Sequence, residues 1–326
     1  MKASPSTLAP LSAPARWPKA SRSSSIFAPG TGSCSSPLLD VFTRERFKGN
    51  PLAVVPKADG LSDAQMQTIA KEFNLSETVF FFKPAAERNT ASLRIFTPYQ
   101  ELPFAGHPTI GSAVVLGLQH KLNAVRMEEK IGLVTALVDR LDKSVGEARF
   151  ALPKLSSRVG EIDDMLGIAQ VLGINVEDIG CDLYKPGVFS AGVPFHLVPV
   201  RNSEVLARLS INHALKPKIF THDRHAVYIF TLTPEEPDND IAARMFGMGL
   251  GEDPGTGAAA AALIGLLAEN QPFATGQSDF VLRQGHEMGR PCRITLQLRK
   301  ENDALVHGAI GGQAIIVGEG TLDLGE

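Results

Sequence analysis

An internal repeat is the feature that most constrains how this chain of 326 residues can fold. The segment HPTIGSA at 107–113 aligns without gaps to DPGTGAA at 253–259. An Arg-apolar-Phe sequence precedes each segment, and an apolar run follows each one. Such a duplication predicts two domains related by pseudo-twofold symmetry, each a strand-rich layer wrapped on a central apolar helix.

The domain boundaries follow from composition and from the repeat. Residues 1–36 are rich in Ser and Pro, and no acidic residue occurs before Asp40, so we expect this segment to be disordered and outside the fold. Its Arg and Ser content is typical of a transit peptide, although its Pro spacing disfavours an amphipathic helix. We expect an N-terminal domain at 37–154 and a C-terminal domain at 155–310. The last segment, about 311–326, is a candidate strand that completes the first domain.

Charge and cysteine usage exclude several classes of partner. After residue 36 the chain carries 28 basic and 35 acidic residues, which disfavours binding to nucleic acid. The longest apolar run, at 257–268, is shorter than the ~20 residues that cross a bilayer, so we expect no membrane span. The three cysteines are far apart and include no CxxC pair, which disfavours a disulfide scaffold or a structural zinc. A soluble, cytoplasmic protein is expected.

The two repeated segments predict a binding site at two helix starts. Proline is favoured at the first helical position, so Pro108 and Pro254 place His107 and Asp253 at the capping positions. The small residues that follow leave backbone N–H groups accessible, and the positive end of a helix dipole favours an anion. If the symmetry brings both starts to one cleft, a small carboxylate fits between them. Asp253 alone is an ordinary helix cap, whereas histidine is not a favoured cap residue, so His107 needs a second role, in function or in packing, of which we favour function.

A dinucleotide site is excluded by the glycine run at 247–252. Its spacing is not GxGxxG, and Glu252 and Asp253 would place two carboxylates where a pyrophosphate must lie. The chain also has no HExxH, GxSxG or EF-hand sequence. We therefore expect no cofactor and no metal.

Glu77 is a candidate acid–base residue. It lies between a helix expected to end near Phe73 and the strongly apolar segment TVFFF. A carboxylate that enters an apolar strand loses hydration, which favours its neutral form and suits proton transfer near pH 7. The alternative is an exposed carboxylate at the start of a strand.

Five segments, in order, resemble the PhzF or phenazine-biosynthesis-like family from Leu38 onward. They are DVFTRERFKGNPLAVV, LSETVFFF, RIFTPYQELPFAGHPTIGSA, EDPGTGAAAAAL and QGHEMGRPCRI. The resemblance implies the α+β fold of diaminopimelate epimerase, in which two barrel-like domains each surround a central helix. It also implies a homodimer that needs neither cofactor nor metal.

The resemblance assigns roles to particular residues. Glu77 matches the proton carrier in the isomerisation of trans-2,3-dihydro-3-hydroxyanthranilate, while His107 and Asp253 match the residues that flank and assist the substrate. Many relatives have Ser where this chain has Ala258, which puts the phenazine-pathway substrate itself in doubt. The expected substrate-binding positions are Asn50, Gly106, Thr256, Gly257 and Ala258.

The expected function is therefore a cofactor-independent isomerase that moves a proton within a small carboxylate substrate. One alternative is a non-catalytic small-molecule-binding or interaction protein on the same fold. Another is a two-base epimerase or racemase, for which only Asp253 or His107 is available opposite Glu77. Related epimerases use a pair of cysteines at the two helix starts, and those positions carry no cysteine here.

Overall fold

The computed structural model describes residues 33–222, 225–247 and 251–323 of the chain. Residues 1–32 of the expected N-terminal segment lie outside the described residues, as does part of the glycine run at 247–252. Strand β1 begins at Ser33, earlier than the expected domain start at 37, because its backbone pairs with β17 as far as Asp323. Main-chain hydrogen bonds of this kind do not depend on apolar side chains, so composition does not reveal them.

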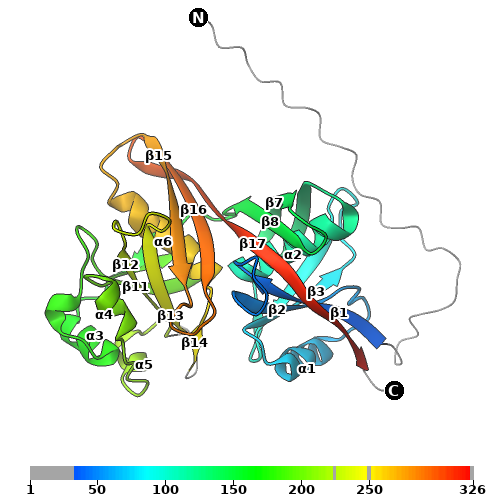
Figure 1. Ribbon diagram of the computed structural model, residues 1–326, viewed down its shortest axis with the longest axis horizontal. Coiled ribbons are helices and arrows are strands. Elements are labelled where there is room, and N and C mark those ends of the chain that lie inside the picture. Colours follow the sequence, from blue (N-terminus) through cyan, green and yellow to red (C-terminus); the bar gives the residue numbers. More distant parts are fainter. Residues whose placement is uncertain (1–32, 223–224, 248–250, 324–326) are drawn as a thin grey trace, which may run out of the picture.

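Strands dominate both halves of the chain, as the short apolar runs predict (Figure 1). The first half contains β1 (Ser33–Val41), β2 (Asn50–Val55), α1 (Asp63–Phe73), β3 (Glu77–Phe82), β4 (Ala91–Phe96), β5 (Glu101–Leu102), α2 (Gly106–His120), β6 (Ala124–Glu129), β7 (Gly132–Arg140) and β8 (Val145–Ala151). The second half contains β9 (Ser157–Gly160), α3 (Met165–Leu172), the 3₁₀ turn η1 (Val176–Asp178), β10 (Gly187–Ser190), β11 (Pro194–Pro199), α4 (Ser203–Ala207), α5 (Lys216–Ile219), β12 (Val227–Leu232), β13 (Ile241–Phe246), β14 (Glu252–Asp253), α6 (Gly257–Glu269), β15 (Gly276–Gln284), β16 (Cys292–Glu301) and β17 (Ala304–Asp323).

The strands of the first half close into a barrel. Within the described residues, the pairing runs β1-β2-β3-β4-β6-β7-β8-β17 and returns to β1. The second half repeats this order with β10, β11, β12, β13, β15, β16 and β17, and the same two pairs are parallel in each half. The molecule therefore has the expected diaminopimelate-epimerase-like α+β fold, with two similar barrel-like domains.

Helices α2 and α6 lie inside the two strand layers. All residues of 106–117 in α2 are buried, and so are those of 257–268 in α6 except the half-buried Ala258. A helix that is apolar on all sides must be surrounded by other elements. Both helices contribute to one large core cluster that continues from one domain into the other.

The structure corrects the register of the internal repeat. Two ion pairs show which residues are equivalent. Arg94 binds Glu101 through Nε and Nη2 at 2.8 and 2.7 Å, and Arg244 binds Glu252 in the same way at 2.8 Å for both contacts. Helices α2 and α6 then begin at Gly106 and Gly257, so the ungapped sequence alignment is shifted by five residues.

The helix caps also differ from the expectation. Helix α2 begins at Gly106, which places His107 inside its first turn, and the N-cap is Ala105. Helix α6 begins at Gly257, and Asp253 lies in β14, before the N-cap Thr256. The proline signal was misleading because residues 254–256 form an extended turn before α6 starts.

The two central helices meet at their first residues. A Cβ atom on Gly106 would lie 2.5 Å from the carbonyl carbon of Gly257, and one on Gly257 would lie 2.9 Å from that of Gly106. Only glycine allows the two backbones to approach this closely. The positive ends of both helix dipoles are therefore joined at the boundary between the domains.

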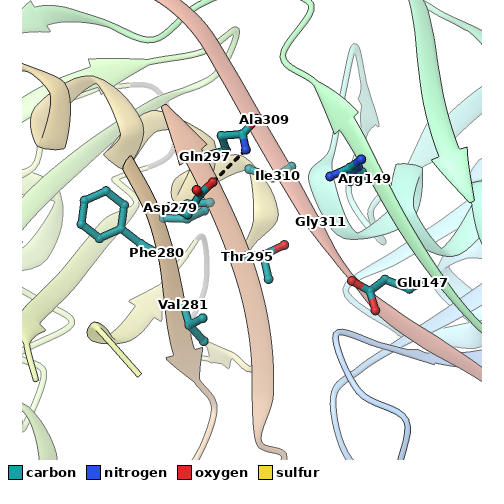
Figure 2. A pocket seen from close by; sticks show the side chains of 11 residues that line it. Glu147, Arg149, Asp279, Phe280, Val281, Thr295, Gln297, Ala309, Ile310 and Gly311 are labelled. Carbon is teal, nitrogen blue, oxygen red and sulfur yellow. Dashed lines mark hydrogen bonds between the residues drawn. The ribbon is translucent and has the colours of Figure 1, made fainter. Parts of the chain in front are cut away.

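Strand β17 connects the two domains, pairing with β16 of one and with β8 and β1 of the other. Figure 2 shows the hollow on the outer sheet face at this crossing, where Gly311 of β17 lies between Thr295 of β16 and Arg149 of β8. Gln297 donates to Asp279 at 2.7 Å on the β16 side.

We expect Gly106→Ala to destabilise the protein by about 1–3 kcal/mol, because the added methyl group strikes backbone atoms that cannot rotate away. Thermal unfolding measures the effect. Gly318→Ala is the matched control, since a Cβ atom at Gly318 meets no atom within 4 Å. Equal melting temperatures for the two variants would contradict the close approach of α2 and α6.

Candidate active site

A cavity of about 350 Å³ lies where the two domains meet. Its wall includes four of the predicted site residues, Glu77, Asp253, Thr256 and Ala258. Apolar side chains from both domains make up much of the rest, namely Leu102, Phe104, Val193, Phe195, Ala226 and Met245. A mostly apolar hollow with a few polar groups is typical of a small-molecule site.

His107 is buried behind this wall and faces Glu77. Glu77 begins β3 and has 15% of its side chain exposed, whereas His107 has 4%. The two side chains approach to 3.5 Å between His107 Nε2 and Glu77 Oε2, a polar contact longer than a strong hydrogen bond. The residue that the cavity exposes is thus a carboxylate, with an imidazole beneath it.

Asn50 joins the groups from the two domains. Its Nδ2 donates to Asp253 Oδ1 and to the carbonyl of Gly255, both at 3.0 Å, and lies 3.4 Å from His107 Nδ1. Nδ2 has two hydrogens for these three neighbours, so the 3.4 Å contact with His107 is at best a shared hydrogen bond. Because Nδ2 has no acceptor capacity, a hydrogen on Nδ1 would face a donor group, which favours the tautomer with the ring hydrogen on Nε2, on the side of Glu77. Asn50 has 0% exposure, so no solvent competes for these contacts.

Burial keeps His107 neutral. It lowers the pKa of His107 to about 4, while the nearby carboxylate of Asp253 opposes the shift. A neutral imidazole with its hydrogen on Nε2 presents the positive end of an N–H dipole to the Glu77 carboxylate without adding a full positive charge to the site.

The segment before α6 is held by several polar contacts. Asp253 accepts from Ser76 Oγ at 2.8 Å and from Thr256 Oγ1. Gln284 accepts from the backbone N–H of Thr256 at 3.0 Å and donates to the carbonyl of Asp253 at 2.7 Å. Tyr228 donates to the same Gln284 Oε1 at 3.0 Å. Asp253 is therefore oriented from both domains.

The polar groups of the site have apolar counterparts across the pseudo-twofold axis. Thr78 and Val227 occupy equivalent positions opposite Phe96 and Phe246, which makes Ala226 the counterpart of Glu77. By the same matching, Leu102 corresponds to Asp253, and Ala258 corresponds to His107 as the second residue of its helix. All three counterparts line the cavity, so in each of these three pairs of described residues one member is an acid–base group and the other is apolar.

A profile of the phenazine biosynthesis-like protein family, PhzC-PhzF, matches residues 39–320. The chain belongs to this family. An uncharacterized isomerase of Mesorhizobium japonicum is 38% identical over 294 residues, 87% of this chain and 97% of that protein. A trans-2,3-dihydro-3-hydroxyanthranilate isomerase of Pseudomonas chlororaphis is 33% identical over 292 residues, 88% of this chain and 98% of that protein.

Solved structures agree with the fold. The crystal structure of a PhzF-family phenazine biosynthesis protein of Bacillus anthracis has a TM-score of 0.79 at 23% identity. The similarity covers 89% of this chain and 99% of that chain. At this level of identity the likeness concerns the fold.

The structure brings together residues that are far apart in the sequence. Glu77, His107 and Asp253 converge on one site, and Asn50 connects two of them. Gly106 and Gly257 lie at the helix contact and not on the cavity wall. Ser76 and Gln284 were missed, although both belong to segments that carry the PhzF resemblance, because sequence alone gave no reason to pair them with Asp253.

Neither a metal centre nor a membrane helix is found in the described part of the chain. It contains no group of three or more His, Cys, Asp and Glu side chains placed to hold a metal ion. Within the same residues, no helix combines the length and the apolar character that crossing a bilayer requires. The homodimer and the cytoplasmic location stay predictions.

Glu129 is a second buried carboxyl group, beneath the first turn of α2. Thr109 Oγ1 lies 2.7 Å from Glu129 Oε1 and 2.8 Å from the carbonyl of Ala105, but it has a single hydrogen to donate. A protonated Glu129 satisfies both contacts, because it donates to Thr109, which donates to Ala105. Burial raises the pKa of Glu129 to about 8, whereas a hydrogen bond donated by Thr109 to the charged carboxylate would lower it.

Glu129 should make stability fall as pH rises. Between about 4.5 and 8 the unfolded chain has lost this proton while the native protein retains it, so the free energy of unfolding decreases by up to ~1.4 kcal/mol per pH unit. Glu129→Gln removes this contribution. We expect the stability of the variant relative to wild type to increase across this range in urea unfolding experiments. The lowered pKa of His107 has the opposite effect, because it makes the free energy of unfolding decrease as pH falls below about 6.5, the pKa of histidine in the unfolded chain. This effect cancels in the comparison, since both proteins contain His107. Parallel stability curves would contradict a neutral Glu129.

Proposed function

We propose that the chain, an isomerase of the PhzF family, moves one proton within a small carboxylate substrate by general acid–base catalysis. The observation that carries the proposal is the carboxylate of Glu77, which lines the cavity and is contacted from beneath by a buried neutral imidazole. The names of the relatives support isomerisation as the reaction class.

In the proposed reaction, Glu77 is both base and acid. Its carboxylate takes a proton from one carbon of the substrate, the double bonds shift, and the same carboxyl group returns the proton to another carbon. No electron is gained or lost, and the product is an isomer of the substrate. The Nε2–H group of His107 orients the carboxylate and stabilises its charged form before the first transfer and after the second.

The asymmetry of the site favours one base over two. Inversion at a single carbon requires an acid–base group on each face of the substrate. Opposite Glu77, the symmetric position holds Ala226, which lines the same cavity and cannot transfer a proton. We therefore favour isomerisation over two-base epimerisation. The polar groups arranged around Glu77 also favour an enzyme over a non-catalytic binding protein.

The charges around the cavity suggest a substrate with both a carboxylate and an ammonium group. Among the described residues, the wall carries Glu77, Glu252 and Asp253 but no Arg, Lys or His. Arg244 neutralises Glu252, and the two helix starts together supply about one positive charge. With Glu77 and Asp253 charged, a substrate carboxylate at the helix starts thus leaves about two negative charges in the site, one of which an ammonium group balances. The hydroxyanthranilate named for the relatives is an amino acid of this kind.

Glu77→Gln tests the mechanism, because glutamine keeps the shape of the side chain but cannot carry the proton. We expect turnover to fall by ~10²–10⁴-fold while ligand binding is largely retained. Glu72→Gln is the matched control, since Glu72 is an exposed carboxylate of α1. Turnover by the Glu77→Gln variant equal to that of wild type would remove Glu77 from the reaction.

The substrate class can be tested without knowing the substrate. We expect cyclic amino acids to raise the melting temperature more than the same acids without the amine, because ligands that bind the native state stabilise it by mass action. Greater stabilisation by the deaminated acids would contradict the charge argument.

The two-base alternative is tested separately, by incubating the amino acids that bind with the enzyme in deuterated water and separating the products by chiral chromatography. A two-base enzyme would yield the mirror-image amino acid.

A further inference from the structure

The turn between β15 and β16 is connected to the active site in two ways, through Gln284 at its start and through the side chain of Arg290 near its end. It begins at Gln284, which holds Asp253 and Thr256, and it ends at Cys292. The N–H of Arg290 donates to the carbonyl of Gly285 at 2.9 Å and closes the turn. The Arg290 side chain then extends across the domain boundary to the first domain.

Three acceptors of the first domain surround the Arg290 guanidinium. Nε donates to the carbonyl of Gly49 at 2.8 Å, and Nη2 donates to Asp40 Oδ1 at 2.6 Å and to the carbonyl of Lys48 at 2.8 Å. The other oxygen of Asp40 accepts from the N–H of Phe47 at 2.6 Å. Asp40 has only 4% of its side chain exposed, so this ion pair is shielded on one side from solvent.

The loop that Arg290 holds leads directly into Asn50. Its backbone has positive φ at Phe42 (65°), Phe47 (66°) and Gly49 (65°). Phenylalanine disfavours this conformation, because its Cβ atom lies too close to the following carbonyl oxygen. The loop therefore depends on contacts from outside itself, and Arg290 supplies three of them at the end next to Asn50.

We propose that Arg290 is a positioning residue for the isomerase reaction. By fixing Gly49 and Asp40 against the second domain, it places Asn50 where its amide reaches both Asp253 and His107. Arginine is suited to this role because its planar fork binds several acceptors at once, which a lysine ammonium at the same position cannot do. This inference rests on the proposed function, in which Asn50 sets the hydrogen position on His107.

Arg290→Lys is the test, because lysine keeps the charge and the pairing with Asp40 but loses the fork. A displacement of about 1 Å in a catalytic array costs on the order of 10²-fold in rate, so we expect kcat to fall by that order with little change in KM. We also expect the pH profile of kcat/KM to change, because His107 loses its partner at Nδ1. Arg299→Lys is the matched control, since Arg299 also lies on the β15–β16–β17 sheet and pairs with a carboxylate, Glu301, at the surface.

A second readout needs no substrate. In nitrogen-edited NMR spectra, the His107 ring and the Asn50 amide signals should shift in the Arg290→Lys protein and stay unchanged in the Arg299→Lys protein. Asp40→Asn should reproduce the shifts, and the double variant should add little to either single one, because both residues act through one contact. If wild type turns over no acid, the proposed function fails while these spectra still decide the role of Arg290. Unchanged His107 and Asn50 signals, or a lower melting temperature with unchanged kcat and pH profile, would overturn the inference.

Discussion

The contact between Gly106 and Gly257 is the constraint on which the site depends. It places two helix N-termini, each equivalent to about half a positive charge, against one another at the domain boundary. Such an arrangement is stable only with negative groups nearby, and Glu77 and Asp253 lie there. The acidic residues of the site and the proposed binding of a substrate carboxylate are thus both related to the same backbone contact.

The symmetric scaffold carries an asymmetric site. The Arg–Glu pairs at 94–101 and 244–252 retain the duplication almost unchanged, because they fix the strand ends that lead into both helices. At the three candidate acid–base positions the symmetry is lost: Glu77 corresponds to Ala226, His107 to Ala258 and Asp253 to Leu102. The residues that maintain the fold are thus alike in the two halves, whereas the residues at the acid–base positions differ. The apolar half forms the surface against which a substrate can lie.

Much of the fold and three of the site residues were predictable from the sequence. Apolar runs located the strands, and the apolar runs that follow the repeated segments at 107–113 and 253–259 indicated the central helices. The register of the repeat was not predictable, because Pro108 and Pro254 match in sequence but belong to different parts of the helix starts. The contacts of Ser76 and Gln284 with Asp253 were also inaccessible, since they arise from tertiary packing between segments up to 177 residues apart. The start of β1 is defined by backbone pairing, on which composition gives no information.

The protonation state of the site depends on both domains together. Asn50 comes from the first domain, but its amide is oriented by Asp253 and by the carbonyl of Gly255 from the second. Those two acceptors fix which end of the amide is the donor, and a donor group beside Nδ1 of His107 disfavours a hydrogen on that atom. The ring hydrogen is then favoured on Nε2, toward Glu77. The tautomer of His107, which is buried in the first domain, therefore depends on acceptors of the second domain. Separation of the domains would change the contact between His107 and Glu77 before it altered the fold of either half.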